Sequence, residues 1–88
     1  MARLGPAYFP GEHCQTTRTL GQRIRARRLA LAWSQEELAD ASGLHWSFVS
    51  QVERGQRNLG LHSLLKIAAG AKIDPGELVT GLRPPRGS

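Results

Sequence analysis

Hydrogen-bonding side chains recur at helical spacing just after residue 45. Ser47, Ser50 and Gln51 fall on one face of an expected helix, and Trp46 lies next to them. A glutamine amide can pair with the N6 and N7 edge of adenine, and a serine hydroxyl can bond to several base edges or to a phosphate. The indole of Trp46 could contact a thymine methyl group or a phosphate, pack against a partner, or lie on the surface. The pattern predicts a surface that reads double-stranded DNA.

Side chains suited to phosphate oxygens flank this reading face. Gln35 is expected at the start of the preceding helix, where free backbone N–H groups favour an anion. Arg54, Arg57 and Asn58 follow the reading face in a loop that contains a glycine. These residues could instead be solvated polar groups. Beside a base-reading face, however, they favour contacts to the DNA backbone.

A helix-turn-helix is needed to position these side chains, and the sequence that follows residue 33 predicts one. Ser34 and Glu37 form a capping-box pattern at the start of the first helix. Gly43 marks the turn. The second helix is expected to run from about Trp46 to Arg54 and to end before a glycine in the left-handed conformation.

Three further helices are expected around this motif. They run from about Leu20 to Leu31, from about Leu61 to Ala69, and onward from Asp74, where an acidic cap precedes a proline. No segment alternates apolar and polar residues for long enough to predict a strand. The expected fold class is all-α, a compact bundle of five helices. The expected core comprises Leu20, Ile24, Leu31, Trp33, Leu38, Ala39, Val49, Val52, Leu61, Leu64, Leu65, Ile67, Ala68, Ile73 and Leu78.

The charge of the chain is consistent with a polyanionic partner. Its 88 residues carry 12 Lys and Arg against 7 Asp and Glu, which gives a formal net charge of +5. Four arginines and one glutamate outside residues 19–82 supply +3 of that total. The placement of individual arginines inside the domain therefore matters more than the total charge.

No residue pattern predicts catalysis or a cofactor. Cys14 and the three histidines lack metal-ligand spacing, and no nucleophile is paired with a base. We therefore expect no enzyme activity, no metal and no cofactor. The single cysteine cannot form an internal disulfide and fits a reducing cytoplasm. No apolar run is long enough to span a membrane.

The chain divides into three parts. Residues 1–17 contain two glycines and two prolines without a helical period, and are expected to form a loose arm. Residues 18–82 are expected to form the folded domain. Residues 83–88 are expected to be a disordered tail, because consecutive prolines cannot continue a helix. Tyr8 and Phe9 could let the arm fold on a protein partner, although the arm could also reach a DNA groove or have no role.

Three short motifs occur in register along the expected domain. They are SQEELA at 34–39, VERGQRN at 52–58 and LLKIA at 64–68. With this order and spacing, residues from about 20 to 79 resemble the phage-repressor and Cro-like DNA-binding domains, also called the xenobiotic-response-element family. The resemblance implies a lambda-repressor-like bundle in which the motif's first helix braces on the DNA backbone and its second reads bases. It also implies a transcriptional regulator, in most members a dimer, and a phosphate contact for Gln35.

The resemblance implies an ion pair as well. The family places an arginine on the first helix opposite a glutamate near the end of the reading helix, here Arg28 and Glu53. This pair would lock the reading helix to the scaffold and bring the guanidinium close to a DNA phosphate. The alternative is a weak surface ion pair. His45 occupies a position where the family often has a capping serine or threonine, and it could approach a phosphate or be solvated.

The chain departs from the family pattern at two turns. Ala32 lies where the family usually has glycine, so that turn could close differently. Leu59 and Gly60 replace a usual Pro-Ser pair, which leaves the following helix without its usual cap. Neither departure touches the expected reading face.

A dimer is expected to form through the last helix, where two apolar residues three apart could remain uncovered by the core. The expected interface comprises Ile73, Leu78, Val79 and Leu82. A two-fold dimer would read a near-palindrome whose half-sites lie one turn, about 34 Å, apart. The expected function is therefore a sequence-specific transcriptional regulator of double-stranded DNA. The alternatives are an antitoxin, which would also bind a toxin protein, and a controller protein of a restriction–modification system.

Overall fold

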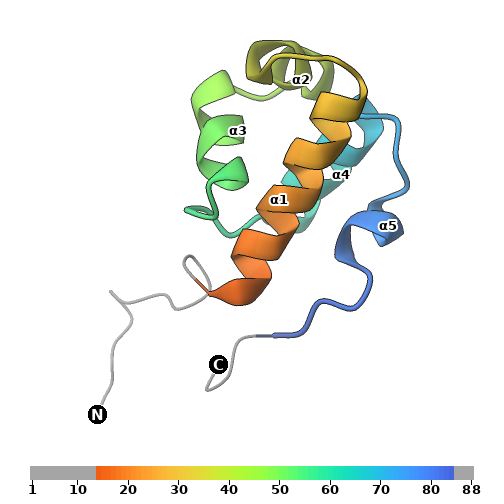
Figure 1. The fold of residues 1–88 in the computed structure, drawn as a ribbon. Coiled ribbons are helices and arrows are strands. Elements are labelled where there is room, and N and C mark those ends of the chain that lie inside the picture. The colour runs from red at the N-terminus through yellow and green to blue at the C-terminus, as the bar shows by residue number, and fades with distance from the viewer. Residues whose placement is uncertain (1–13, 85–88) are drawn as a thin grey trace.

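The computed structural model describes residues 14–84 and contains five α-helices and no strand in that range. The all-α prediction is confirmed. Figure 1 shows α1 crossing the molecule, with α2 at one end of it, α3 on one side and α5 on the other. The helices are α1 (Gln15–Ala30), α2 (Gln35–Ser42), α3 (Trp46–Glu53), α4 (Leu61–Gly70) and α5 (Pro75–Val79).

Local capping signals begin two of the helices where the sequence predicted. Ser34 Oγ accepts a hydrogen bond from the Glu37 amide at 3.0 Å, and the Glu37 carboxylate accepts one from the Ser34 amide at 2.7 Å. Asp74 accepts a bond from the Gly76 amide at 2.9 Å, with proline as the first helical residue. Each cap satisfies backbone N–H groups that have no partner inside the helix.

The first helix begins earlier than predicted. It starts at Gln15 rather than near Leu20, so the last residues of the expected arm are helical. Its N-terminal turn packs against the loop after α3, where a Cβ on Gly55 would come within 2.7 Å of Arg18 Cγ. This tertiary contact accounts for helix in a stretch without apolar periodicity. Residues 1–13 and 85–88, which include the rest of the arm and four of the six tail residues, lie outside the described part.

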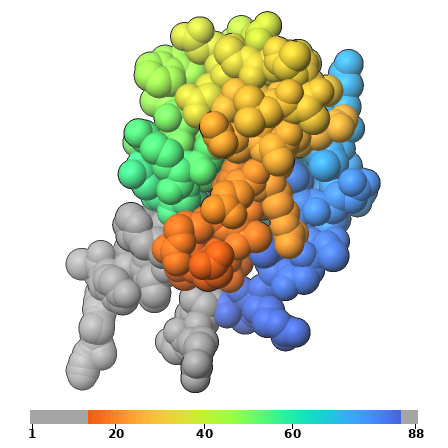
Figure 2. All heavy atoms as spheres, in the orientation of Figure 1, coloured from red at the N-terminus to blue at the C-terminus, as the bar shows by residue number. Residues whose placement is uncertain are grey.

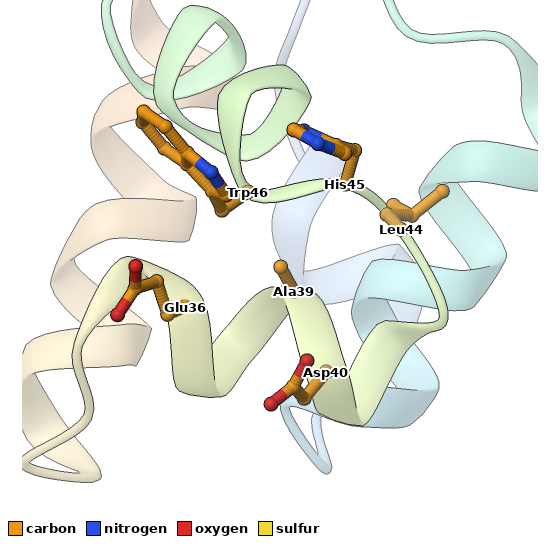
Figure 3. Close-up of a pocket in the computed structure, with 6 residues that line it drawn as sticks. All are labelled: Glu36, Ala39, Asp40, Leu44, His45 and Trp46. Atoms are coloured by element: carbon orange, nitrogen blue, oxygen red, sulfur yellow. The ribbon is translucent and has the colours of Figure 1, made fainter.

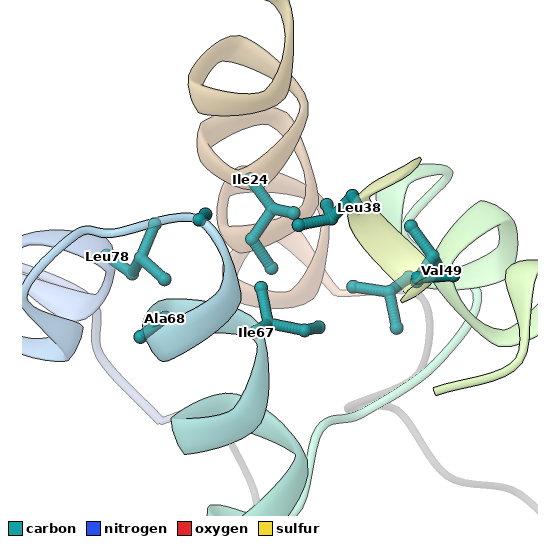
Figure 4. Close-up of a cluster of buried hydrophobic side chains, with 9 residues drawn as sticks. Ile24, Leu38, Val49, Ile67, Ala68 and Leu78 are labelled. Carbon is teal, nitrogen blue, oxygen red and sulfur yellow. The ribbon is translucent and has the colours of Figure 1, made fainter. Parts of the chain in front are cut away.

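The core lies where α1, α2, α3 and α4 meet, with α5 closing one side. Figure 4 shows side chains from all five helices converging there. Two predictions about the core are wrong: Leu61 is 66% exposed and Leu65 is 43% exposed. The core also includes a residue that the sequence analysis omitted, Ala71. The largest fully buried side chains are Ile24, Leu38, Val49, Val52, Ile67 and Leu78.

Two arginines of α1 bind the main chain around α5. Arg23 donates to the carbonyl oxygens of Leu78 and Thr80 at 3.1 and 2.7 Å. Arg27 donates to those of residues 71 and 72 at 2.9 and 3.0 Å. All four acceptors lie at or just beyond the C-terminal ends of α4 and α5, where carbonyls lack partners within the helix. These two arginines therefore fix the C-terminal helices on α1.

The turn after α1 has an unusual backbone conformation. Ala32 adopts φ +60°, in the left-handed region that favours glycine. This is the position where the family usually carries glycine. The turn therefore keeps its left-handed conformation, although the Cβ atom of alanine makes that conformation energetically costly.

Among the described residues, no helix has the length and apolar character that crossing a membrane requires.

Candidate nucleic-acid interface

The four expected base readers lie on the side of α3 that faces away from the core. Val49 and Val52 are buried and attach the opposite side of α3 to the bundle. Figures 1 and 2 show α3 along one edge of the molecule, where it is not covered by α4 or α5. Trp46 is 50% exposed. Ser47, Ser50 and Gln51 are half-buried and share this outward side with it.

His45 caps the start of α3. Its Nδ1 accepts a hydrogen bond from the Ser47 amide at 3.1 Å and lies 2.8 Å from the Ser47 hydroxyl. The imidazole stacks on the indole of Trp46, with ring centroids 6.0 Å apart. Because Nδ1 is an acceptor here, the neutral ring carries its proton on Nε2. That leaves one N–H at an exposed side chain as a donor for a phosphate.

An acidic hollow of about 330 Å³ borders the reading side where α2 meets the start of α3. Figure 3 shows the carboxylates of Glu36 and Asp40 on α2, with Trp46 and His45 across from them. The two carboxylates repel phosphate groups. The lining residues are Glu36, Ala39, Asp40, Leu44, His45 and Trp46.

Arg28 and Glu53 join α1 to the end of α3 through a two-bond ion pair. The Arg28 Nε–Glu53 Oε2 distance is 2.7 Å, and the Nη2–Oε1 distance is 2.9 Å. The helices cross closely here, since a Cβ on Gly21 would lie 2.2 Å from the carbonyl oxygen of Val52. The hydrogen bonds to Glu53 raise the pKa of Arg28, although burial alone would lower it. This pair holds α3 against the scaffold.

Burial corrects the expectation that Arg28 also reaches DNA. The residue is only 8% exposed, and its third nitrogen, Nη1, donates to the carbonyl oxygen of Trp33 at 2.8 Å. All three guanidinium nitrogens therefore have acceptors inside the domain. Gln35 joins the same group, since its Nε2 donates to Glu53 Oε1 at 3.1 Å. The first turn of α2 also holds backbone N–H groups that have no acceptor inside the helix.

The loop after α3 carries the exposed basic and amide side chains of this region. Gly55 has φ +75° and turns the chain back, so that Arg54, Arg57 and Asn58 lie exposed beyond the end of α3. Arg57 Nε donates to Gln51 Oε1 at 2.8 Å. The sequence analysis missed this contact, because no helical or strand period relates a loop residue to the helix that precedes it.

The expected dimer surface on α5 is partly wrong. Leu78 is only 1% exposed and belongs to the core, so it is not available to a partner. Ile73 packs against the core, and Leu82 is half-buried. Val79 is 38% exposed and remains available. Helix α4, which packs against α5, exposes two further apolar residues, Leu61 and Leu65, which were wrongly assigned to the core.

A metal site in the described part of the chain would need a cluster of residue types that bind metals. No group of three or more His, Cys, Asp or Glu side chains there could hold a metal ion.

Comparison with known proteins agrees with this geometry. Residues 24–78 match the family model of the helix-turn-helix. The controller protein C.AhdI of Aeromonas hydrophila, from a restriction–modification system, is similar in structure, with a TM-score of 0.69. The two chains are 50% identical, and the match covers 70% of this chain and 94% of that one.

Two control proteins are similar in sequence. C.BamHI of Bacillus amyloliquefaciens is 38% identical over 60 residues, which cover 67% of this chain and 74% of that protein. C.SmaI of Serratia marcescens is 36% identical over 70 residues, which cover 77% of this chain and 83% of that protein. With the match over residues 24–78 and the arrangement of α2 and α3, these similarities show that the chain belongs to the helix-turn-helix family of DNA-binding transcriptional regulators.

Proposed function

We propose that this chain is the controller-type regulator of a restriction–modification system and binds a near-palindromic operator as a homodimer. The observation that carries the proposal is the 50% identity to a controller protein over 94% of that protein's chain. The geometry supports it, because the outward side of α3 combines an exposed aromatic ring with hydroxyl and amide groups. These groups suit the varied base edges of a major groove. The protein would act in the cytoplasm, where such operators lie.

The proposed site separates base readers from phosphate contacts. Base edges would meet the outward side of α3, and the backbone would meet the two ends of the motif, where free N–H groups and positive charge lie. Arg28 is left out of this set because it is buried. The proposed base readers are Trp46, Ser47, Ser50 and Gln51, and the proposed phosphate contacts are Gln35, His45, Arg54, Arg57 and Asn58.

The proposed dimer forms through the apolar surface of α4 and α5. Leu61, Leu65 and Val79 are all substantially exposed, and α4 packs directly against α5. Two copies related by a two-fold axis would cover these side chains with each other. The two α3 helices would then enter successive major grooves about 34 Å apart.

Selection of binding sites from a random DNA pool tests the proposal. The expected result is a near-palindrome with half-sites about one turn apart, which also occurs upstream of linked restriction and modification genes. Gln22→Ala, which alters an exposed amide on α1, serves as a control and should select the same sequence. Selection of no common sequence, or of a single half-site, would contradict the proposal.

A further inference from the structure

Gln51 and Arg57 are joined in a way that fixes the direction of the Gln51 amide. Arg57 Nε lies 2.8 Å from Gln51 Oε1. A guanidinium group can only donate hydrogen bonds, so the atom that faces it must be the amide oxygen. The NH₂ group of Gln51 therefore points away from Arg57. The hydrogen bond assigns the amide orientation on chemical grounds.

Arg57 is itself held in place by an aromatic ring. Its guanidinium carbon lies 5.4 Å from the ring centroid of Phe48, within the range of a cation–π contact. Phe48 is half-buried and packs against the core, so the ring is a firm support. Phe48 and Gln51 are three residues apart on α3 and are neighbours on its surface. The long, exposed side chain of Arg57 is therefore preorganised in the free protein.

This orientation changes which base Gln51 suits. Pairing with adenine needs one acceptor and one donor from the same amide. Here Arg57 occupies one of the two lone pairs of the amide oxygen and holds that oxygen toward itself, so the end of the amide that faces away from Arg57 is the NH₂ donor. The remaining N–H groups of the Arg57 guanidinium are donors as well. A surface of donors matches guanine, which presents only acceptors, N7 and O6, in the major groove.

We propose that Arg57 is a positioning residue that acts through Gln51 and sets it to read guanine rather than adenine. The inference rests on the proposed function, in which the outward side of α3 faces base edges. It replaces the adenine pairing expected from the residue type alone. It also gives the loop after α3 a part in sequence preference, beyond the contribution of its charge to phosphate binding.

The test compares the base preference of variants rather than their affinity alone. The first step uses Gln51→Ala to find the base pair at which the selected sequence responds to Gln51. Kd is then measured for operators that carry guanine or adenine at that position. Arg57→Met removes the donors while keeping a side chain of similar length. Because loss of a phosphate contact weakens all sequences alike, the ratio of the two Kd values isolates the effect on base reading.

The wild type is expected to prefer guanine by about five-fold or more, the lower range for one good base contact. Arg57→Met should reduce the preference to about unity or turn it toward adenine. Arg54→Met is the matched control. It removes a neighbouring exposed arginine that is not hydrogen-bonded to Gln51, and it should weaken binding to both operators while leaving the ratio unchanged. Circular dichroism would verify that the variants are folded.

A second measurement uses wild-type protein and modified DNA, so its result does not depend on whether a variant folds. Replacing the guanine by 7-deazaguanine removes the N7 acceptor and should weaken wild-type binding by about five-fold or more. The proposal is overturned if the wild type prefers adenine, if Arg57→Met keeps the guanine preference, or if 7-deazaguanine has no effect. Those results leave the proposed function intact. If Gln51→Ala alters no position of a selected operator, the assignment of the reading face fails too.

Discussion

Arg28 and Glu53 are paired across the crossing of α1 and α3, with two nitrogen–oxygen distances of 2.7 and 2.9 Å. Both residues are buried, at 8% and 7% exposed, and Gln35 donates a third bond to the same carboxylate. The pair therefore connects α1, the start of α2 and the end of α3. Its removal should affect both the stability of the domain and the placement of α3.

Loss of one partner of this pair should strongly destabilise the fold. Arg28→Met leaves the Glu53 carboxylate buried without its counter-ion, so we expect the free energy of unfolding to fall by about 3–5 kcal/mol. Urea denaturation followed by circular dichroism measures this change. Arg25→Met, at an exposed arginine of the same helix, is the control and should change stability little. A small effect at Arg28 would show that the pair is not structural.

The pH dependence of this contribution follows from the direction of the pKa shift. The bonds to Glu53 raise the pKa of Arg28 in the folded state. The associated stabilisation is therefore fully present below the unfolded-state pKa of arginine and is lost only as pH rises through the higher folded-state value. Near neutral pH, the titration of Arg28 should therefore cause no pH dependence in the difference in unfolding free energy between wild type and Arg28→Met.

Replacement of Ala32 by glycine should stabilise the domain. Ala32 has φ +60°, a conformation that costs an L-residue about 1–2 kcal/mol, part of which the greater chain entropy of glycine offsets. We expect a net gain of about 0.5–1 kcal/mol in the free energy of unfolding. Thermal melts measure it. Ala30→Gly, within α1, should have the opposite sign, and a loss of stability at position 32 would contradict the account.

Trp46 is expected to contact a thymine methyl group. The indole is half exposed at the start of α3 and stacks on His45, so it can pack against the floor of a major groove. Trp46→Ala should weaken operator binding by about 1–3 kcal/mol. Substituting uracil for thymine removes the methyl group alone. If the indole makes this contact, uracil should weaken the wild type and leave Trp46→Ala unaffected; an equal effect on both proteins would place the indole elsewhere.

Arg54 is expected to contribute charge without sequence preference. It is exposed in the loop after α3, where the positive groups can approach phosphates. Arg54→Ala should weaken binding to all sequences alike and reduce the slope of log K against log salt concentration by about 1. Fluorescence anisotropy over a salt series measures the slope. Arg23→Ala offers a contrast, because that arginine is engaged with main-chain carbonyls and should leave the slope unchanged.

The dimer is expected to depend on α4 more than on the buried part of α5. Leu61→Glu and Leu65→Glu should produce monomers in sedimentation equilibrium, because a carboxylate in the apolar interface would lose its hydration. Leu29→Glu is the matched control, since Leu29 is also an exposed leucine, at 51%, but lies on α1. It should leave the mass unchanged. A monomeric wild type, with or without operator, would remove the proposed dimer.

The sequence was most informative where a structural signal is local. The capping box at Ser34 and the Asp74-Pro75 start of α5 each involve residues within three positions of one another, and both were predicted correctly. The start of α1 was not, because Gln15 is helical through contacts that its N-terminal turn makes with a distant loop. Leu61 and Leu65 were misplaced since helical spacing identifies apolar residues but not which of them a neighbour covers.

The candidate site shows the same division. Helical spacing placed Trp46 and Gln51 on one side of α3 correctly in outline, because Val49 and Val52 point the other way. The bond from Arg57 to Gln51 depends on how the chain turns at Gly55 and could not be obtained from spacing. Side-chain partners across a turn are set by tertiary geometry. The orientation of the Gln51 amide could therefore be inferred only from the structure.

Arg23 and Arg27 bind α5 and the turn before it through carbonyl oxygens alone. Every residue type supplies a carbonyl, so these bonds do not themselves depend on which side chains the four acceptor residues carry. None of the acceptors lies on α3. In the proposed dimer, the contacts that set the spacing of the half-sites are therefore separate from the residues of α3 that read bases. Such a protein can drift to a new operator sequence while its quaternary geometry stays constant.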